Sequence, residues 1–427
     1  MLLRLAALAA LVVVFAVAAP ARAGDRPLND TLTLDDAFAR VAASHPDLRL
    51  IDARDDVLAG ERDQAAQRPA LVAGAELENA FGSGDYAALD RAELTLSLAS
   101  VLERGGKLDA RRALAQSRID ALALERETTR LDLLAEVARR YLAVVAAQRL
   151  RGIAQADIGQ RQRTVAAARQ RLTAGASPES VVLTAQAALA RAELERHRSA
   201  QTEIAARQHL AALWGEREPR FAIAAGDPLA LPAIADFDAL AALLQGTPEL
   251  ARFADQRRIG EARLQLARAQ AVPDLDWQLG VRALNENSDA ALVAGVSMPL
   301  GSARRAQPQI RTAQAELAMV EVEREAQGLA LYSTLVDAHG RYRIAQLEVA
   351  RLQDDVLPKL GQAEAEAERA YRAGAISYLE WAQLQSERTA MRRQQIETAL
   401  DAQRALIEIQ RLTGQAFIAA PAQGPAP

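Results

Sequence analysis

The stretch Arg171-Leu172-Thr173-Ala174-Gly175-Ala176 returns further along the chain as Tyr371-Arg372-Ala373-Gly374-Ala375-Ile376. Gly175 and Gly374 are 199 residues apart. Three further pairs of landmarks recur in the same order at offsets of 199 to 204 residues: Leu213-Trp214-Gly215 with Leu412-Thr413-Gly414, Arg68-Pro69-Ala70-Leu71 with Val272-Pro273-Asp274-Leu275, and His45-Pro46-Asp47-Leu48 with Thr247-Pro248-Glu249-Leu250. Four ordered matches indicate a tandem duplication of a unit of about 200 residues, far longer than a solenoid repeat.

The first unit alternates between helical and extended patterns. Residues 35–43 predict a short helix with Thr33 as N-cap, and residues 47–67 predict a longer one. Residues 71–80 and 92–101 then alternate apolar and polar side chains. Each stretch is about ten residues long, which is the length of a tilted membrane-crossing strand.

A long helical pattern follows these strands. Coiled-coil spacing predicts a helix from residue 107 to about 172. The tip at 172–178 contains Ala174-Gly175, and there Ser177 is expected to be the N-cap and Pro178 the first-turn residue of the helix that returns to Trp214.

The second unit repeats this plan. It predicts strands at about 275–284 and 290–299, a long helix from 304 to 372, a tip at 371–377 and a final helix to Leu412. The expected organisation of the chain is a signal peptide, a first repeat, a linker, a second repeat and a disordered tail: 1–23, 24–215, 216–234, 235–414 and 415–427.

The first 23 residues have the pattern of a secretory signal. Arg4 precedes an apolar run from Leu5 to Ala19, and Ala21-Arg22-Ala23 resembles a cleavage site. The apolar run is shorter than the roughly 20 residues of a membrane-spanning helix. We therefore expect an exported protein. The chain has no cysteine, which excludes disulfides, thiolate metal sites and an N-terminal lipidated cysteine.

Charge and motifs exclude several classes of function. The formal net charge is −4, which argues against a nucleic-acid partner. The sequence lacks metalloprotease, serine-hydrolase and Walker motifs, so we expect a protein that is not an enzyme. The four histidines are not at metal-ligand spacing, so neither a bound metal nor a cofactor is expected.

Four strands per chain cannot close a barrel, and lipid does not tolerate an open sheet edge. Three copies would pool twelve strands, which is within the range of outer-membrane barrels. The expected fold is therefore mainly α with a membrane β-barrel contribution, assembled as a trimeric α/β barrel. Its watery lumen would be lined by Glu76, Glu78, Asp276 and Arg282. The same alternation of apolar and polar residues is also compatible with a soluble protein that carries two edge hairpins, and this is the alternative.

The chain resembles TolC-family outer-membrane efflux channels over residues 32–414. The resemblance rests on the duplicated helix–hairpin–long-helix plan and on the Ala-Gly tips followed by Ala185-Gln186 and Ala382-Gln383. Three stretches, at 76–84, at 94–98 and at Glu103-Arg104-Gly105-Gly106-Lys107, are similar to the subgroup that works with cobalt–zinc–cadmium exporters.

This resemblance implies a homotrimer with a barrel in outer-membrane lipid and a helical tunnel in the periplasm. Such channels are passive and join a periplasmic adaptor (membrane fusion) protein to an inner-membrane pump of the resistance–nodulation–division class. The cargo expected from the subgroup is divalent heavy-metal cations, and the alternatives are drug efflux and type I protein secretion. Outside this family, a periplasmic adaptor and a structural coiled-coil protein are the competing hypotheses.

The resemblance also implies functional residues. The adaptor would dock on the two tips, through Leu172, Ala174, Gly175, Ala176, Ser177, Tyr371, Ala373, Gly374, Ala375, Ile376 and Ser377. Gate or selectivity roles would fall to Tyr371, Glu380 and Gln383, the last standing where the family carries a second acid. Ile376 stands where a gate arginine is expected, so the corresponding salt bridge is not predicted. The glycines would serve equally well as simple helix C-caps.

Overall fold

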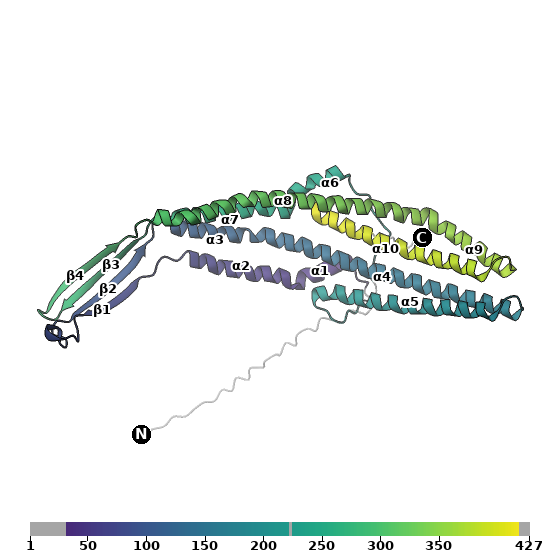
Figure 1. The fold of residues 1–427 in the computed structure, drawn as a ribbon, viewed down its shortest axis with the longest axis horizontal. Coiled ribbons are helices and arrows are strands. Elements are labelled where there is room, and N and C mark those ends of the chain that lie inside the picture. The colour runs from purple at the N-terminus through teal and green to yellow at the C-terminus, as the bar shows by residue number, and fades with distance from the viewer. Residues whose placement is uncertain (1–30, 222–223, 418–427) are drawn as a thin grey trace, which may run out of the picture.

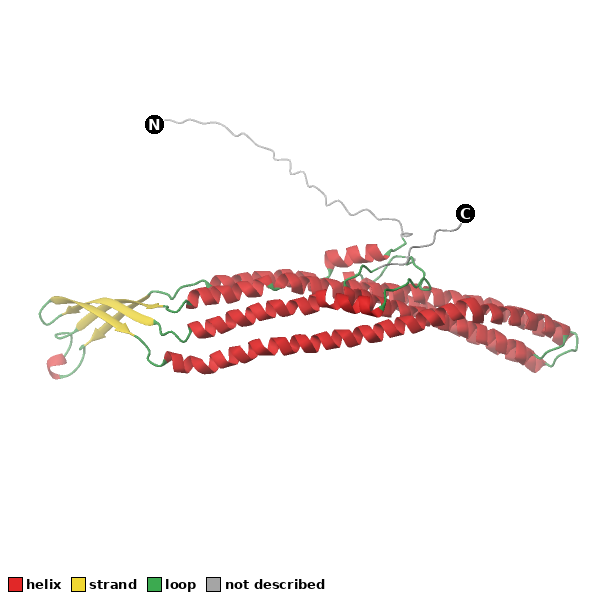
Figure 2. Ribbon diagram, turned by 90° about the horizontal axis from the view of Figure 1, so that it is seen from above, coloured by secondary structure: helices red, strands yellow, loops and turns green. Residues whose placement is uncertain are grey.

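The computed structural model describes residues 31–221 and 224–417. The expected signal peptide and most of the expected tail lie outside these residues. The molecule is elongated, with a sheet at one end and two helical hairpins at the other (Figure 1). A view from above gives the same arrangement (Figure 2). None of the helices in the described part of the chain combines the length and hydrophobicity that crossing a membrane requires.

The order of elements repeats once along the chain. The first repeat contains α1 (Leu34–Ser44), α2 (Pro46–Ala65), β1 (Val72–Glu78), β2 (Glu93–Leu102), α3 (Lys107–Asp120), α4 (Leu122–Thr173) and α5 (Glu179–Ala211). The second contains α6 (Phe237–Leu243), α7 (Pro248–Ala269), β3 (Leu275–Leu284), β4 (Asp289–Ser297), α8 (Ser302–Arg351), α9 (Leu357–Ala373) and α10 (Tyr378–Thr413). The predicted fold class, mainly helical with a four-stranded contribution, is confirmed.

The four strands form one antiparallel sheet in the order β1-β2-β3-β4. The two hairpins therefore meet through β2 and β3, where Thr95 lies opposite Arg282. β1 and β4 are the outer strands, and within the described chain each has one edge without a partner strand. The sheet of one protomer is thus open on both sides.

Two strands differ slightly from the expected ranges. β1 ends at Glu78 rather than near residue 80, because Asn79 has a positive φ of 54° and leaves the extended conformation. β4 ends at Ser297, two residues before Pro299, which has no N–H to donate to a strand ladder.

Each repeat has its own apolar core where the short N-terminal helix meets the long helices. In the first, the buried Tyr141 hydroxyl donates towards the carbonyls of Leu32 (2.9 Å) and Ala225. In the second, the buried Tyr342 hydroxyl donates to the carbonyl of Pro232. Burial raises the pKa of both hydroxyls to about 12, so both remain protonated donors at neutral pH. The two tyrosines fix equivalent segments of chain against equivalent helices.

The two long helices are interrupted, contrary to expectation. The first breaks at Ala121, where no glycine or proline marks the position. Beyond the break, Glu125 and Arg126 form ion pairs with Arg54 and Asp52 of α2, which are tertiary contacts that sequence spacing does not contain.

The second long helix widens into a π-helix at Leu352–Val356. Pro358 follows directly, at the start of α9. Proline cannot donate to the carbonyl four residues earlier and its ring crowds that carbonyl, so a wider turn accommodates it.

The start of α5 also differs from the prediction. The helix begins at Glu179, so Pro178 occupies the N-cap position and Ser177 lies before it. The Ser177 hydroxyl makes no capping bond. The capping residue expected at the first tip is therefore wrong, because the turn carries Ser177 away from the helix N-terminus.

Candidate functional site: two helical tips and a polar sheet face

The two tips have the same backbone geometry. Gly175 and Gly374 both adopt the left-handed conformation, with φ of 70° and 82°. The amide of Gly175 donates to the carbonyl of Leu172 (2.9 Å), and the amide of Gly374 donates to that of Tyr371 (3.0 Å). The next amide in each turn reaches one residue further back, which is the Schellman pattern. Glycine has no Cβ to oppose this conformation, and this explains the Ala-Gly pair at both positions.

The residues predicted for docking are mostly at the surface. The exposed members are Ala174, Gly175, Ala176, Ala373, Gly374, Ala375 and Ser377, and the half-buried ones are Leu172, Ser177 and Ile376. Tyr371 differs, because only 2% of it is exposed. A rigid partner could therefore touch the apex of either turn but could not reach the Tyr371 ring.

An aromatic cluster lies beneath the apex. The Tyr371 ring centroid lies 5.1 Å from that of Trp381 and 6.4 Å from that of Tyr378. Arg171, from the first tip, stacks on the Tyr371 ring at 5.1 Å and donates to the carbonyls of Tyr371 (2.6 Å) and Ala176 (3.3 Å). Arg171 thus joins the two tips within one protomer. Sequence analysis missed it, because an isolated arginine at a helix end carries no signal of a partner 200 residues away.

Polar atoms without a partner gather at this cluster. Among the described residues, Arg171 Nε, Ser177 Oγ, Tyr371 Oη and Trp381 Nε1 are buried and make no hydrogen bond. All four can donate a hydrogen bond. Burying a donor without an acceptor costs about 1–3 kcal/mol, so the closed contact between the tips contains an unfavourable contribution that an added acceptor would relieve.

The predicted gate residues lie just beyond the second tip. Glu380 and Gln383 are both exposed. Glu380 Oε2 accepts hydrogen bonds from the backbone N–H and the hydroxyl of Ser377, both at 2.8 Å, completing a capping box. These bonds hold the pKa of the Glu380 carboxyl below its usual value. In this structure Glu380 therefore stabilises the start of α10, and its gate role stays a prediction.

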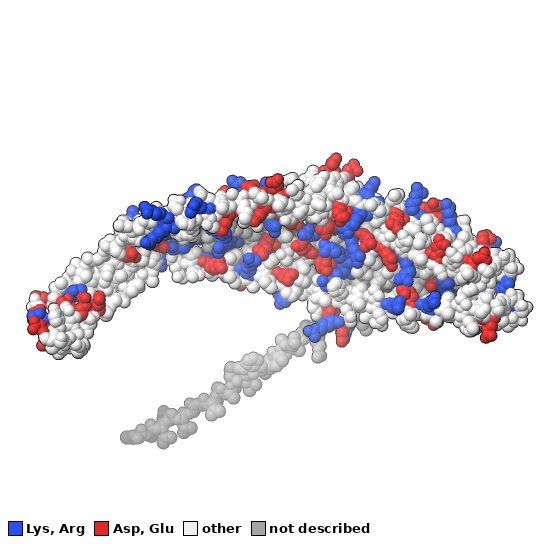
Figure 3. All heavy atoms as spheres, in the orientation of Figure 1, with Lys and Arg blue, Asp and Glu red and all other residues white. Residues whose placement is uncertain are grey.

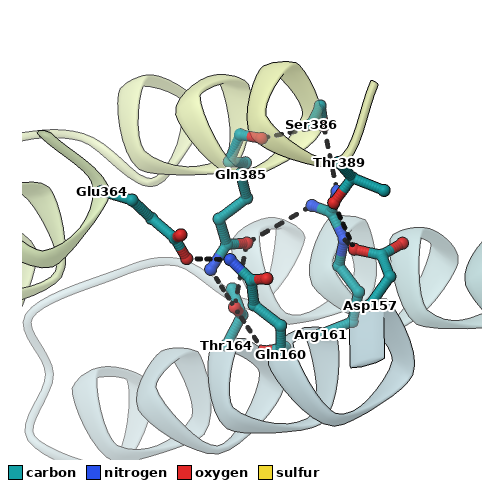
Figure 4. Close-up of polar contacts among 9 residues, drawn as sticks. Asp157, Gln160, Arg161, Thr164, Glu364, Gln385, Ser386 and Thr389 are labelled. Carbon is teal, nitrogen blue, oxygen red and sulfur yellow. Dashed lines mark hydrogen bonds and ion pairs between the residues drawn. The ribbon is translucent and has the colours of Figure 1, made fainter. Parts of the chain in front are cut away.

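Further from the tips, a layer of polar side chains lies between the two hairpins (Figure 4). Arg161 on α4 is 7% exposed and donates to Gln385 (3.4 Å) and Ser386 (3.1 Å) on α10. Thr164 exchanges hydrogen bonds with Gln385, and Thr389 donates to Asp157 at 3.2 Å. Because buried polar partners are satisfied only in one alignment, this layer fixes how the two hairpins lie against each other.

The same layer contains an acidic residue. Glu364 on α9 is 6% exposed and accepts hydrogen bonds from Gln160 of α4 and Arg388 of α10. It therefore connects helices of both repeats (Figure 4). Sequence analysis did not single it out, since the helix pattern alone does not distinguish it from the neighbouring surface glutamates.

At the other end of the molecule, the four residues predicted for the lumen lie on one face of the sheet. Arg282 binds Glu78 (2.9 Å) and Glu93 (2.8 Å) and donates to Thr95 (3.0 Å). Glu76 is the register partner of Thr95 and so lies on the same face. On that face too, Asp276 accepts from the hydroxyl of Ser297 at 3.4 Å. Glu93 was missed, because it opens the second strand next to a polar loop.

The opposite face of the sheet is apolar and uncovered. Its large side chains are between 41% and 78% exposed: Leu77, Leu94, Leu96, Leu98, Leu102, Leu279, Val281, Leu292 and Val296. A contiguous apolar face of this kind marks a membrane or protein contact. Within the described ranges, no group of three or more histidine, cysteine or acidic side chains is placed to hold a metal ion.

Comparison with known proteins identifies relatives. The outer membrane efflux protein family model matches residues 39–216. The cobalt-zinc-cadmium resistance protein CzcC of Cupriavidus metallidurans is 28% identical over 279 residues, which cover 65% of this chain and 67% of that protein.

Solved structures share the fold. CusC, described as forming a transmembrane channel, superposes with a TM-score of 0.75 at 17% identity, covering 92% of this chain and 95% of that one. The outer-membrane channel OprN gives 0.74 at 20% identity, covering 90% of each chain. The outer membrane protein VceC of Vibrio cholerae gives 0.70 at 18% identity, covering 90% and 97%.

Proposed function

We propose that the chain, which matches the outer membrane efflux protein family over residues 39–216, lies in the outer membrane, extends into the periplasm and is the passive exit channel of a tripartite metal-efflux system. Three copies would form it, each supplying four strands to a barrel and two helical hairpins to a tunnel. An adaptor and an inner-membrane pump would complete the system. The channel itself performs no catalysis in this proposal.

The observation that carries the proposal is the sheet. One face is charged and hydrogen-bonded around Arg282, the other is apolar and exposed, and both edge strands lack a partner in the described chain. Lipid excludes open edges, so strands of this kind are stable in a membrane only when several chains close the sheet. Closure with the apolar face outward would turn Glu76, Glu78, Asp276 and Arg282 toward water.

The helical tips support adaptor docking. Their apices present small residues with little side chain, so the backbone of a partner can approach closely. The unpaired donors beneath, at Arg171, Ser177, Tyr371 and Trp381, offer hydrogen bonds to acceptors brought by that partner once the tips separate. In the proposed cycle, docking relieves an unfavourable closed contact and so favours the open tunnel.

Divalent heavy-metal cations are the proposed cargo. Support comes from the similarity to CzcC. The lumen face is also acidic, because Arg282 pairs with both Glu78 and Glu93 and Glu76 lies on the same face. Three copies would multiply this excess of carboxylates, and rings of acidic side chains favour cations. The family suggests a ring of three Glu380 carboxylates at the tunnel entrance, and this ring would also favour cations.

The test is the cobalt, zinc and cadmium content of cells lacking the chain, grown at sublethal metal. Accumulation that the intact gene reverses would support metal efflux. Unchanged metal content would contradict the proposed cargo. If drug sensitivity increased instead, the cargo would be drugs, and if a secreted protein were lost, it would be that protein; the proposal of an exit channel would stand in both cases. The Arg171→Ala variant removes the contact between the tips, and a variant of this kind that conducts no ions in planar bilayers would contradict the channel itself.

A further inference from the structure

Arginines occur at every connection between the sheet and the helices. Arg68 lies between α2 and β1, Arg104 between β2 and α3, Arg268 in the last turn of α7 before β3, and Arg304 with Arg305 in the first turn of α8 after β4. All five are exposed. Since the sheet is antiparallel, these four connections meet at the same end of it. The fold therefore brings together cations that are up to about 240 residues apart in the sequence.

These arginines have no ion-pair partner among the described residues, because other cations occupy the neighbouring carboxylates. Asp274 binds Lys107 at 2.7 Å and accepts the Arg104 backbone N–H at 3.0 Å. Glu103 binds Arg111. The guanidinium groups thus remain free to bind an anion from outside the chain.

Among these arginines, Arg104 borders the apolar face of the sheet. Met298 continues the alternation of β4 on that face and is 43% exposed, and Leu300 is 81% exposed. The Arg104 guanidinium lies 3.9 Å from the Met298 sulfur. The uncovered apolar surface therefore gives way directly to cationic groups.

The opposite end of the sheet has the other charge. Its loops and strand ends carry Asp85, Asp90, Glu286 and Asp289, with Arg91 shared between Asp85 and Glu286. In the space-filling view a nearly uncharged stretch of sheet separates this mixed, acid-containing end from a gathering of basic side chains (Figure 3). The charge of the molecule thus changes sign across the apolar band.

We propose that the junction arginines (Arg68, Arg104, Arg268, Arg304 and Arg305) bind the headgroups of anionic phospholipids in the leaflet that faces the periplasm. The inference rests on the proposed channel, because it requires the apolar face of the sheet to lie in the bilayer. Guanidinium groups pair with phosphate in two-pronged geometry, and basic residues at the border of a membrane segment attract anionic lipid. The contact fixes the depth of the barrel in the membrane.

The test uses the full trimer in vesicles of phosphatidylethanolamine, with or without phosphatidylglycerol. The variant Arg104→Gln/Arg304→Gln/Arg305→Gln removes three junction charges and leaves the Asp274 and Glu103 contacts in place. The matched control Arg163→Gln/Arg169→Gln/Arg191→Gln removes three exposed charges from α4 and α5, which lie beyond the membrane. The readouts are the temperature at which the trimer dissociates and the phosphatidylglycerol retained after purification.

Phosphatidylglycerol is expected to raise the dissociation temperature of the unaltered protein and of the control. The junction variant should lose at least half of that rise and retain less of the lipid. At molar salt the rise should vanish in the unaltered protein, because the screening length falls to about 3 Å. An equal rise in the junction variant would overturn the inference. If that variant does not assemble, a rise that molar salt leaves unchanged in the unaltered protein overturns it instead.

Conductance of the Arg171→Ala variant, which lacks the contact between the tips, separates this inference from the proposed function when it is measured in the same bilayers. A lipid response without conductance contradicts the channel and keeps the lipid contact. Conductance without a response to phosphatidylglycerol contradicts the lipid contact and keeps the channel.

Discussion

The two repeats share a backbone plan, but their tips are stabilised differently. Both turns use a left-handed glycine with the same hydrogen bonds. The second tip then begins its helix with a complete capping box between Ser377 and Glu380, whereas the first begins at Pro178 with no side-chain cap. The first tip instead sends Arg171 across to Tyr371 of the second. The two tips thus share the residues that set the backbone and differ in the side chains that join the two halves.

The largest expected effect comes from a bulky residue at the second tip. Gly374→Arg would place a Cβ 3.2 Å from the Arg171 guanidinium and force a left-handed arginine, at a cost of about 1–2 kcal/mol. We expect trimers to assemble and export to be abolished, because the contact between the tips and the docking apex are both disturbed. Export of labelled metal from cells and trimer bands on gels measure the two outcomes.

Two controls use glycines of the same conformation. A Cβ at Gly175 or at Gly414 meets no atom within 4 Å. Gly414→Arg, which lies far from the tips, should retain export, and Gly175→Arg should reduce it less than Gly374→Arg does. Normal export from Gly374→Arg would contradict the docking assignment.

The equivalent tyrosines provide the next comparison. Tyr141→Phe removes the side-chain bond to the Ala225 carbonyl and should destabilise the protein by about 1–2 kcal/mol. Tyr342→Phe should cost less, because Gln346 also donates to the Pro232 carbonyl, at 3.4 Å. Thermal unfolding of both variants under one condition measures the difference in stability. A larger loss in Tyr342→Phe than in Tyr141→Phe would show that the hydrogen bonds to these carbonyls do not determine the cost.

The serines of the two tips are expected to contribute differently to stability. Ser377→Ala removes a helix cap and should destabilise the second tip by about 1 kcal/mol. Ser177→Ala should be neutral or slightly stabilising, because it removes a buried hydroxyl that has no partner. Hydrogen exchange of the first turns of α10 and α5 reports each tip separately. Equal losses of protection at both tips would contradict this distinction.

The smallest effect concerns pH. The pKa of Glu380 is lowered in the folded protein, so its stabilising bonds to Ser377 are present above the ordinary carboxyl pKa, which is near 4.5, and are lost as the pH falls below it. The first turn of α10 should therefore exchange faster at low pH, after correction for intrinsic rates. Glu380→Gln keeps a capping side chain without a charge and should remove this pH dependence, while α5 serves as the internal reference.

Much of the fold could be predicted because its signals are local. Period-two alternation indicates strands, and an Ala-Gly pair at the end of a long helical pattern indicates a turn. The break at Ala121 and the burial of Tyr371 could not be predicted, because both follow from contacts between distant segments. The π-helix before Pro358 did have a local signal in the proline.

The candidate sites divide in the same way. Alternation was sufficient to put Glu76, Glu78, Asp276 and Arg282 on one face, since side chains in a strand point to alternate sides. It could not identify Glu93 as the second partner of Arg282, because that pairing depends on the register between β2 and β3. Arg171 and Glu364 were missed for the same reason, since each acts on a helix of the other repeat.

The open sheet also makes the protein vulnerable before it assembles. In the proposed trimer, a protomer that has not yet met its partners exposes apolar side chains such as Leu292, which is 78% exposed, beside the two edges of the described sheet that have no partner strand. Such edges template aggregation, so a solitary protomer is the most vulnerable stage in the life of the protein. Its survival depends on how soon partners meet it, a step whose rate rises with concentration. The proposed assembly therefore requires the sheet to close soon after the chain is exported, and a holding chaperone would lengthen the interval that the chain tolerates.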